Sequence, residues 1–232
     1  MVIPLHDDNP TTTKPRVTVG IMIACTIIYI FQHLLLSRAG ATHVIYALGV
    51  IPALLTGQAT ADFSSFPPAL TVLTSMFVHG GFWHLAGNML YLWIFGNNVE
   101  EAMGHVKFLA FYLLCGVAAV AAQVLPNTAS EIPMVGASGA ISGVLGAYML
   151  LYPRARVLLG LPLGFVIVEL GRWPAIWVLV AWFAMQLVMG ALSAASSAPG
   201  GVAFGAHVGG FVAGCLLVTV FKRRAVPLWR RY

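Results

Sequence analysis

Gly136-Ala137-Ser138-Gly139 opens an apolar segment of membrane-spanning character and places one serine among small residues at its start. A hydroxyl at that position either fills space between closely packed helices or acts as a nucleophile. The two interpretations predict different proteins, because only the second predicts an enzyme. The remainder of the sequence distinguishes between them.

The composition is that of a membrane protein. Of the 232 residues, 59% are apolar and only 8% are charged, and the mean hydropathy is +0.89. A water-soluble domain of this composition would expose large apolar patches. Six apolar runs approach the ~20 residues with which a helix crosses a bilayer. The predicted spans are Val17–Leu36, Phe82–Val99, Val106–Leu125, Ser138–Tyr152, Ala175–Leu192 and Val202–Phe221.

An all-α polytopic bundle of six transmembrane helices is therefore the expected fold, over residues 17–221. Residues 1–16 are predicted to form a short cytoplasmic segment and residues 222–232 a basic cytoplasmic tail. The first connection, Ser37–Leu73, is too apolar for a solvated loop, so we expect it to lie partly in the membrane interface or against the bundle. The first apolar run is about twice the length of a signal-peptide core, which indicates a retained helix.

Basic residues predict the orientation of the helices. If the N-terminus is cytoplasmic, every Lys and Arg except Arg38 falls on the cytoplasmic side, as the positive-inside rule requires. These positions explain the net charge of +5, so nucleic-acid binding is not indicated. We expect both termini in the cytoplasm of a prokaryotic cell, since no targeting presequence is found.

Polar residues recur at one depth in three of the predicted spans. His84, Ser138 and His207 each precede the first cytoplasmic-side charge of their segment by 15 or 16 residues. At a rise of ~1.5 Å per residue they lie ~22–24 Å above that side, well above the midplane of a ~30 Å hydrocarbon core. Asn88 follows His84 by four residues and shares its helix face. Because polar groups facing lipid are costly, these side chains are expected to point inward, either as polar contacts between helices or as a site.

Small residues accompany Ser138 and His207 at the spacing of a helix-packing ridge. They are Gly139, Ser142, Gly143 and Gly146 in one span and Gly205, Gly209, Gly210 and Gly214 in the other. Such ridges let two helix backbones approach closely. We therefore expect Ser138 and His207 to come within hydrogen-bonding distance.

This pairing supplies what nucleophilic catalysis requires. A serine hydroxyl is a weak nucleophile until a base takes its proton, and a neutral imidazole is the usual base. Attack on an amide creates an oxyanion, for which His84, Asn88 and the backbone N–H of Ser138 are candidate donors. No acidic residue lies in a predicted span near His207, so a Ser–His dyad fits the sequence.

The sequence lacks the residues that other classes of intramembrane protease require. The sequence contains no HExxH zinc site, and Asp7, Asp8 and Asp62 all lie outside the predicted spans, which argues against an aspartyl protease. We expect no metal and no other cofactor. A small transporter is a further alternative, but neither inverted repeats nor charged helices near the midplane are found. The remaining histidines near span ends are expected at the interface: His33, His43, His79 and His105.

The same residues resemble the rhomboid family of intramembrane serine proteases. The stretch Leu73–Met89 resembles that family's entry to its second helix and contains its HxxxN element. The four residues that open the fourth span match its GxSG element, and Gly205–Gly214 matches its GAHxxGxxxG element. The resemblance extends over about Tyr46–Phe221, and the order of these elements is highly specific.

The resemblance implies an intramembrane endopeptidase that cleaves single-pass transmembrane substrates near their extracytoplasmic end. It makes Ser138 the nucleophile and His207 the general base, with His84 and Asn88 stabilising the oxyanion. It also implies contact with membrane lipid, no obligate partner and no cofactor. Substrate would enter past the fifth helix, whose aromatic residues are candidates for a gate: Trp177, Trp182 and Phe183. A silent relative that only binds membrane clients is the alternative, although such proteins usually lack the serine or the histidine.

Two positions depart from the family pattern. Some relatives carry a Trp-Arg pair in the first long loop, whereas this loop has no Trp and only Arg38. Some relatives also place an aromatic residue four positions after the nucleophile, stacked on the catalytic histidine. That position is Ser142 here, so another group must hold His207.

Overall fold

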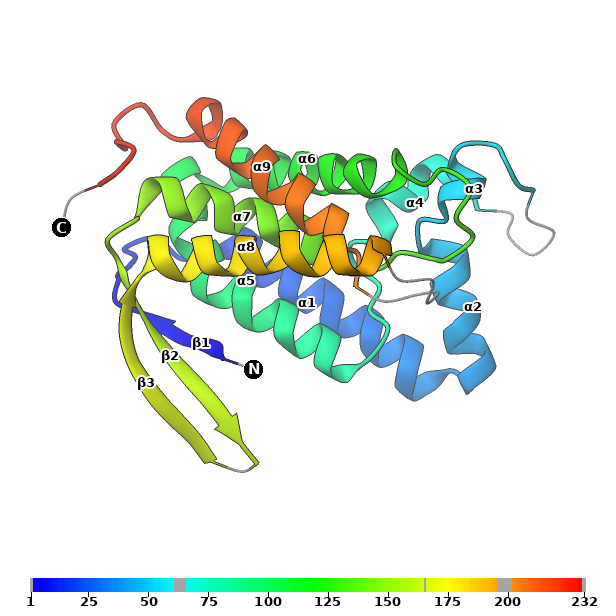
Figure 1. Ribbon diagram of the computed structural model, residues 1–232, viewed down its shortest axis with the longest axis horizontal. Helices are drawn as coiled ribbons and strands as arrows, with labels where there is room; N and C mark the ends of the chain where they lie inside the picture. Colours follow the sequence, from blue (N-terminus) through cyan, green and yellow to red (C-terminus); the bar gives the residue numbers. More distant parts are fainter. Residues whose placement is uncertain (1, 61–65, 165, 196–201, 231–232) are drawn as a thin grey trace.

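A helical bundle with a small β-sheet at one end forms the molecule (Figure 1). The computed structural model describes residues 2–60, 66–164, 166–195 and 202–230. Asp62, one of the aspartates outside the predicted spans, and Arg231, one of the basic residues expected on the cytoplasmic side, lie outside the described residues. The predicted helical membrane bundle is confirmed.

All six predicted spans form helices with boundaries close to those expected. The first, α1 (Arg16–Ile30), continues directly into a π-helical turn, Phe31–Leu35. The other five are α5 (Phe82–Met103), α6 (His105–Val124), α7 (Ser138–Leu151), α8 (Ala175–Ala195) and α9 (Phe204–Phe221).

Four described helices are long and apolar enough to cross a membrane by themselves: the first, α6, α8 and α9. The helix α7 has only 14 residues, but it is buried along nearly its whole length and packs against α5, α6, α8 and α9. It is therefore the central helix of the bundle, and protein rather than lipid surrounds it.

The first connection folds into short helices, α2 (Arg38–Leu48), α3 (Pro52–Leu55) and α4 (Pro68–Thr74). It packs against the bundle, as its apolar composition predicts: Val50 is buried with two valines of α6 and pairs with Met134 through backbone hydrogen bonds.

A three-stranded antiparallel sheet, which the sequence analysis did not predict, lies where α7 ends and α8 begins (Figure 1). Its order is β1 (Ile3–Asp7), β2 (Arg156–Leu163) and β3 (Val166–Pro174). The hairpin β2–β3 is rich in β-branched and aliphatic residues and turns at Gly164, whose φ of +64° suits glycine. The strand β1 pairs with a segment distant in sequence, and such pairing leaves no local signature.

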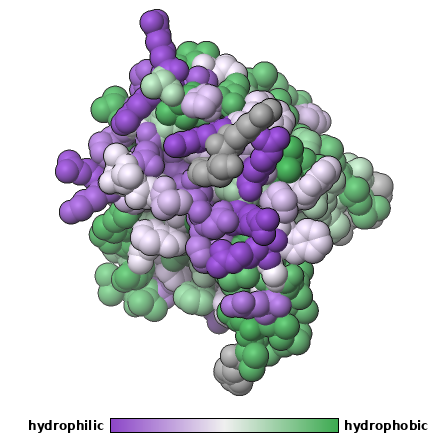
Figure 2. All heavy atoms as spheres, turned by 90° about the vertical axis from the view of Figure 1, so that its left-hand side faces the viewer, coloured by the Kyte–Doolittle hydropathy of each residue, from purple (hydrophilic) through white to green (hydrophobic). Residues whose placement is uncertain are grey.

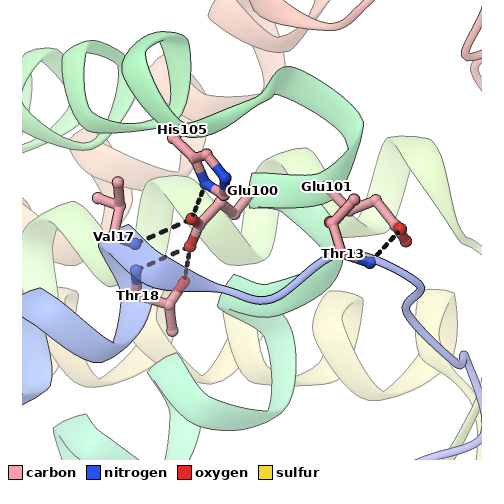
Figure 3. A network of polar contacts seen from close by, with 6 residues as sticks. All are labelled: Thr13, Val17, Thr18, Glu100, Glu101 and His105. Carbon is pink, nitrogen blue, oxygen red and sulfur yellow. Dashed lines mark hydrogen bonds and ion pairs between the residues drawn. The ribbon is translucent and has the colours of Figure 1, made fainter.

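A buried carboxylate of α5 caps the beginning of α1 (Figure 3). Glu100 is 1% exposed and accepts hydrogen bonds from the backbone N–H groups of Val17 at 2.9 Å and Thr18 at 2.8 Å. The Thr18 hydroxyl donates to it at 2.7 Å, and Nδ1 of His105 lies 2.5 Å from it. The first N–H groups of a helix lack partners within the helix and attract negative charge. Glu100 therefore fixes α1 to the α5–α6 turn.

Replacing Glu100 by Gln is expected to lower the free energy of unfolding by about 2 kcal/mol, because the capped N–H groups lose a charged acceptor. Denaturant unfolding in detergent measures the change. The matched substitution Glu131→Gln, at an exposed loop position, should leave stability unchanged. Equal stability of Glu100→Gln and the parent protein would contradict the assigned role.

The strand β1 is tied to α7 through one side chain. The Tyr148 hydroxyl of α7 donates a hydrogen bond of 2.5 Å to Oδ2 of Asp7. Burial raises the pKa of the Asp7 carboxyl from 3.8 to about 6, against the opposing effect of the Tyr148 hydrogen bond. Asp7 is thus a titratable group that joins the sheet to the central helix.

The raised pKa predicts a pH dependence of stability. Protonated Asp7 favours the folded state, so its contribution is complete below the unfolded-state value near pH 3.8 and is lost as the pH rises through about 6. The Asp7→Asn variant should show a shallower fall of melting temperature across this window, measured in detergent. An identical slope in both proteins would exclude Asp7 as the source.

Candidate active site

The helices that carry the predicted site residues begin at the end of the bundle opposite the sheet (Figure 1). His84 is the third residue of α5, Ser138 the first of α7 and His207 the fourth of α9. The residues therefore lie near the starts of three helices, in line with the common depth counted from the sequence.

Glycines let α7 and α9 approach to backbone contact. A Cβ atom on Gly210 would lie 2.0 Å from the carbonyl oxygen of Gly139, and one on Gly214 would lie 2.0 Å from that of Gly143. Any larger residue would push the helices apart. The predicted close packing of these two helices is confirmed.

Other small residues of the two ridges have different neighbours. A Cβ on Gly205 would meet Gln123 and one on Gly209 would meet Ala122, both of α6. Gly205 and Gly209 therefore lie on the side of α9 that packs against α6, so the ridge of α9 permits close packing with two neighbouring helices. The Ser142 hydroxyl donates to the Ser138 carbonyl at 2.7 Å within α7.

Ser138 and His207 are brought together by this packing. Nε2 of His207 lies 2.8 Å from Oγ of Ser138, and both residues are half-buried. Nδ1 of the same ring lies 2.8 Å from Oε1 of Gln186, which is 4% exposed on α8. An amide oxygen only accepts, so Nδ1–H donates to Gln186 and Nε2 is left to accept the serine proton.

Gln186 was missed by the sequence analysis, which left open what holds His207. A signal for it exists: Gln186 is the only amide, hydroxyl or charged side chain in the predicted span Ala175–Leu192. A lone polar group in a span faces protein rather than lipid. Trp182, also on α8, lies with its ring centroid 6.0 Å from that of His207 and bounds the imidazole from the same helix.

His84 and Asn88 lie beside the backbone that leads to Ser138. A Cβ on Gly136 would be 2.6 Å from two ring atoms of His84 and 3.8 Å from Nδ2 of Asn88. Gly136 has a φ of +119°, and its N–H donates to the Ser75 carbonyl at 2.8 Å. Nδ2 of Asn88 donates to the His84 carbonyl at 2.9 Å. Both side chains thus lie beside the segment that precedes the nucleophile, close to the N–H groups at the start of α7.

The expectation of an interfacial position is wrong for His79. This residue is fully buried: the Nε2 atom of His33, in the turn that ends the first span, lies 3.0 Å from its carbonyl oxygen, and its own Nδ1 lies 3.3 Å from the Phe77 carbonyl oxygen. Its ring centroid lies 5.2 Å from that of His84 in an edge-on arrangement. Burial, and secondarily the neighbouring His84, lower the pKa of His79 to about 4. A neutral His79 therefore packs edge-on against the His84 ring.

The arrangement contains a hydroxyl paired with an imidazole and nearby N–H donors, which is the equipment of nucleophilic acyl transfer. Within the part of the chain that the structure describes, no group of three or more His, Cys, Asp or Glu side chains is placed to hold a metal ion.

Comparison with known proteins assigns the chain to a family. The family model described as the Rhomboid domain matches residues 67–224, which is more than half of the chain. The chain belongs to the rhomboid family. The matched region includes α5 to α9 and with them every residue of the candidate site.

Rhomboid relatives come from several lineages. Rhomboid protein 1, mitochondrial, of Saccharomyces cerevisiae is 34% identical over 152 residues, 63% of this chain and 40% of its own length. RHOMBOID-like protein 5 of Arabidopsis thaliana is 30% identical over 153 residues, 66% of this chain and 44% of its own. Rhomboid protease GluP of Bacillus subtilis is 42% identical over 78 residues, 34% and 15% of the two chains. The chain thus spans less than half the length of these relatives. Because they include yeast, plant and bacterial proteins, they do not show that this chain lies in a prokaryotic membrane.

The geometry around His207 predicts the effect of changing Gln186. Gln186→Met removes the acceptor at similar volume, so the imidazole loses its fixed tautomer. We expect the reaction of Ser138 with a serine-directed fluorophosphonate to slow about 10- to 100-fold, as when other residues that orient a reacting group are lost. The rate of covalent labelling in detergent measures this effect.

Gln186→Glu is the matched control, because it retains an oxygen acceptor and should keep more of the labelling rate. The melting temperature of Gln186→Met should stay close to that of the parent, which separates orientation from folding. An unchanged labelling rate in Gln186→Met would show that the Gln186 contact has no influence on the serine.

Proposed function

We propose that this rhomboid protein is an intramembrane serine endopeptidase that hydrolyses peptide bonds in single-pass transmembrane proteins. The observation that carries the proposal is the 2.8 Å contact between Ser138 and His207, with the second ring nitrogen held by Gln186. One of its relatives bears the name Rhomboid protease. The substrate class and the active dyad are expectations that follow from the family resemblance and from this geometry.

The proposed reaction begins with attack of Oγ of Ser138 on the scissile carbonyl carbon, while Nε2 of His207 takes the hydroxyl proton. The carbonyl oxygen becomes an oxyanion, for which the N–H groups at the start of α7 and the side chains of His84 and Asn88 are the nearest donors. Gln186 keeps the resulting imidazolium oriented by accepting from Nδ1–H.

Collapse of this intermediate breaks the C–N bond, and Nε2–H of His207 gives its proton to the leaving amine. Water then attacks the carbonyl carbon of the acyl-serine ester while His207 takes a proton from the water. The bond between this carbon and Oγ breaks, His207 returns the proton to Oγ of Ser138, and the second product leaves as a carboxylic acid. Every proton is carried by one imidazole, so the cycle needs no metal or other cofactor.

Substrate access is proposed from the side of α8, at the end of the bundle where the site lies. Of the aromatic residues expected at a gate, Trp177 is the third residue of α8 and so lies at the sheet end, opposite the site, whereas Trp182 and Phe183 lie against α9. Phe183 stacks on Phe211 with centroids 4.6 Å apart. Opening a path to Ser138 would therefore require α8 to move these two rings.

Orientation in the membrane is also part of the proposal. The basic residues around the sheet and the C-terminal segment favour a cytoplasmic location for that end. The site then opens toward the extracytoplasmic side, and a prokaryotic cytoplasmic membrane is the expected location. Substrate would be cut near its extracytoplasmic end.

Ser138→Ala is expected to abolish cleavage of a membrane-anchored test substrate in proteoliposomes while the folded bundle is retained. Loss of the nucleophile removes the covalent route, so the product should fall below detection on a gel. Ser142→Ala, one helical turn further along α7, is the matched control and should retain activity because its hydroxyl donates to a backbone carbonyl of the same helix and not to His207.

Cleavage by Ser138→Ala at the parent rate would overturn the protease assignment. Absence of cleavage by the parent protein, together with binding of the same substrate, would favour the alternative of a silent client-binding rhomboid protein.

A further inference from the structure

The hairpin β2–β3 carries an apolar surface for which the bundle provides no cover. It begins at the end of the bundle opposite the site and projects away from the helices, below α5 in the view of Figure 1. Every described residue of β3 except Pro174 is exposed, and several of these residues are large and apolar. Seen from that end, hydrophilic residues gather over the middle of the molecule, and a mainly hydrophobic projection extends below them (Figure 2).

The strand register separates the two faces of this hairpin by polarity. Residues directly opposite each other in an antiparallel pair lie on the same face. One face carries Val157 with Trp173, Leu161 with Val168 and Leu163 with Val166, all of them apolar. The other face carries every charge of the two strands: Arg156, Glu169 and Arg172.

A β-bulge produces this separation. Glu169 and Arg172 are three residues apart, so in a regular strand they would lie on opposite faces. The register shifts between Leu159 and Gly160, so that Leu170 is left over on β3, and the adjacent Gly171 has a φ of +93°. The extra residue returns Glu169 to the face of Arg172 and keeps Val168 on the apolar face.

The apolar face is the one that points toward the bundle. Val157 is fully buried in the main hydrophobic core, and Leu159, two residues along β2, packs against that core. Asp7, opposite Val157 on the same face, reaches Tyr148 of α7. Nearer the turn of the hairpin, the side chains on this face are no longer covered by the bundle. Leu163, Val166 and Val168 there are 58%, 62% and 42% exposed.

We propose that the β2–β3 hairpin is a membrane-binding element that lies on the lipid leaflet at the sheet end of the bundle. Its apolar face continues the surface of membrane-spanning helices, and lipid is what adjoins that surface beyond the bundle. The charged face then points to water, where Arg156 and Arg172 lie within reach of lipid phosphates. This proposal concerns a surface remote from Ser138 and does not depend on the proposed protease function.

The free edge of β3 limits how deeply the hairpin enters. Its outward N–H and C=O groups pair with no strand among the described residues, and such groups are costly in hydrocarbon. The hairpin therefore lies in the headgroup region, with its tip at the acyl boundary, as amphipathic elements on membranes do. Because β3 leads directly into α8, the depth of the hairpin also sets the height at which α8 enters the membrane.

Site-specific fluorescence tests the proposal. Single cysteines are introduced at Val166, Val168, Glu169 and Arg172 in a background with Cys25, Cys115 and Cys215 replaced by alanine, and each is labelled with a polarity-sensitive dye. The proteins are reconstituted into vesicles of phosphatidylcholine and phosphatidylglycerol. All four side chains are exposed, so labels there leave the bundle intact.

Labels at 166 and 168 should emit at shorter wavelength, be quenched by lipids carrying a nitroxide near the headgroup, and resist iodide in the water. Labels at 169 and 172 should show the reverse, although 168 and 169 are adjacent in sequence. Equal quenching by iodide at all four positions would overturn the proposal. So would disulfide crosslinks between copies at Val168→Cys in dilute vesicles, since they would assign the apolar face to a second copy of this chain.

Discussion

The contact between α7 and α9, where glycine backbone meets glycine backbone, is the constraint on which the candidate site depends. A Cβ at Gly210 has no room because the carbonyl oxygen of Gly139 occupies its place. The hydrogen bond between Ser138 and His207 joins the same two helices about one turn away. A displacement of one ångström would break it, and misplacement on that scale costs enzymes heavily. The small residues thus contribute to the site indirectly, because they let α7 and α9 pack closely enough for Ser138 and His207 to form a hydrogen bond.

The opposite end of the molecule is held by hydrogen bonds to carboxyl groups rather than by close backbone contact. Glu100 caps α1 from α5, and Asp7 joins the sheet to α7 through Tyr148. The buried Glu100 is tolerated because it accepts hydrogen bonds from several donors. The central helix α7 is therefore fixed at both ends, with the nucleophile at its beginning and Tyr148 near its other end. This arrangement gives a rhomboid bundle with a rigid centre and a more exposed α8 along its side.

The features predicted from the sequence are those with a local signal. Hydropathy locates the six helices, residue spacing predicts the contact of α7 with α9, and counting from the charged ends puts His84, Ser138 and His207 at one level. Gln186 was missed because its lone polar side chain indicates only which side of α8 faces protein, and the packing of α8 against α9 decides that it meets His207. The sheet was missed because β1 finds its partner only after the bundle has brought distant segments together. The burial of His79 was missed because it depends on contacts with the end of the first span and with His84, which only the folded bundle creates.

The most direct test of this account is to identify by mass spectrometry the residue that a fluorophosphonate modifies in the folded protein. We predict a single adduct on Ser138 that forms far more slowly in His207→Ala, since the hydroxyl then has no base to take its proton. An adduct on another serine, or labelling of Ser138 at the same rate in His207→Ala, would contradict the central claim that helix packing at Gly139 and Gly210 creates a reactive Ser–His pair.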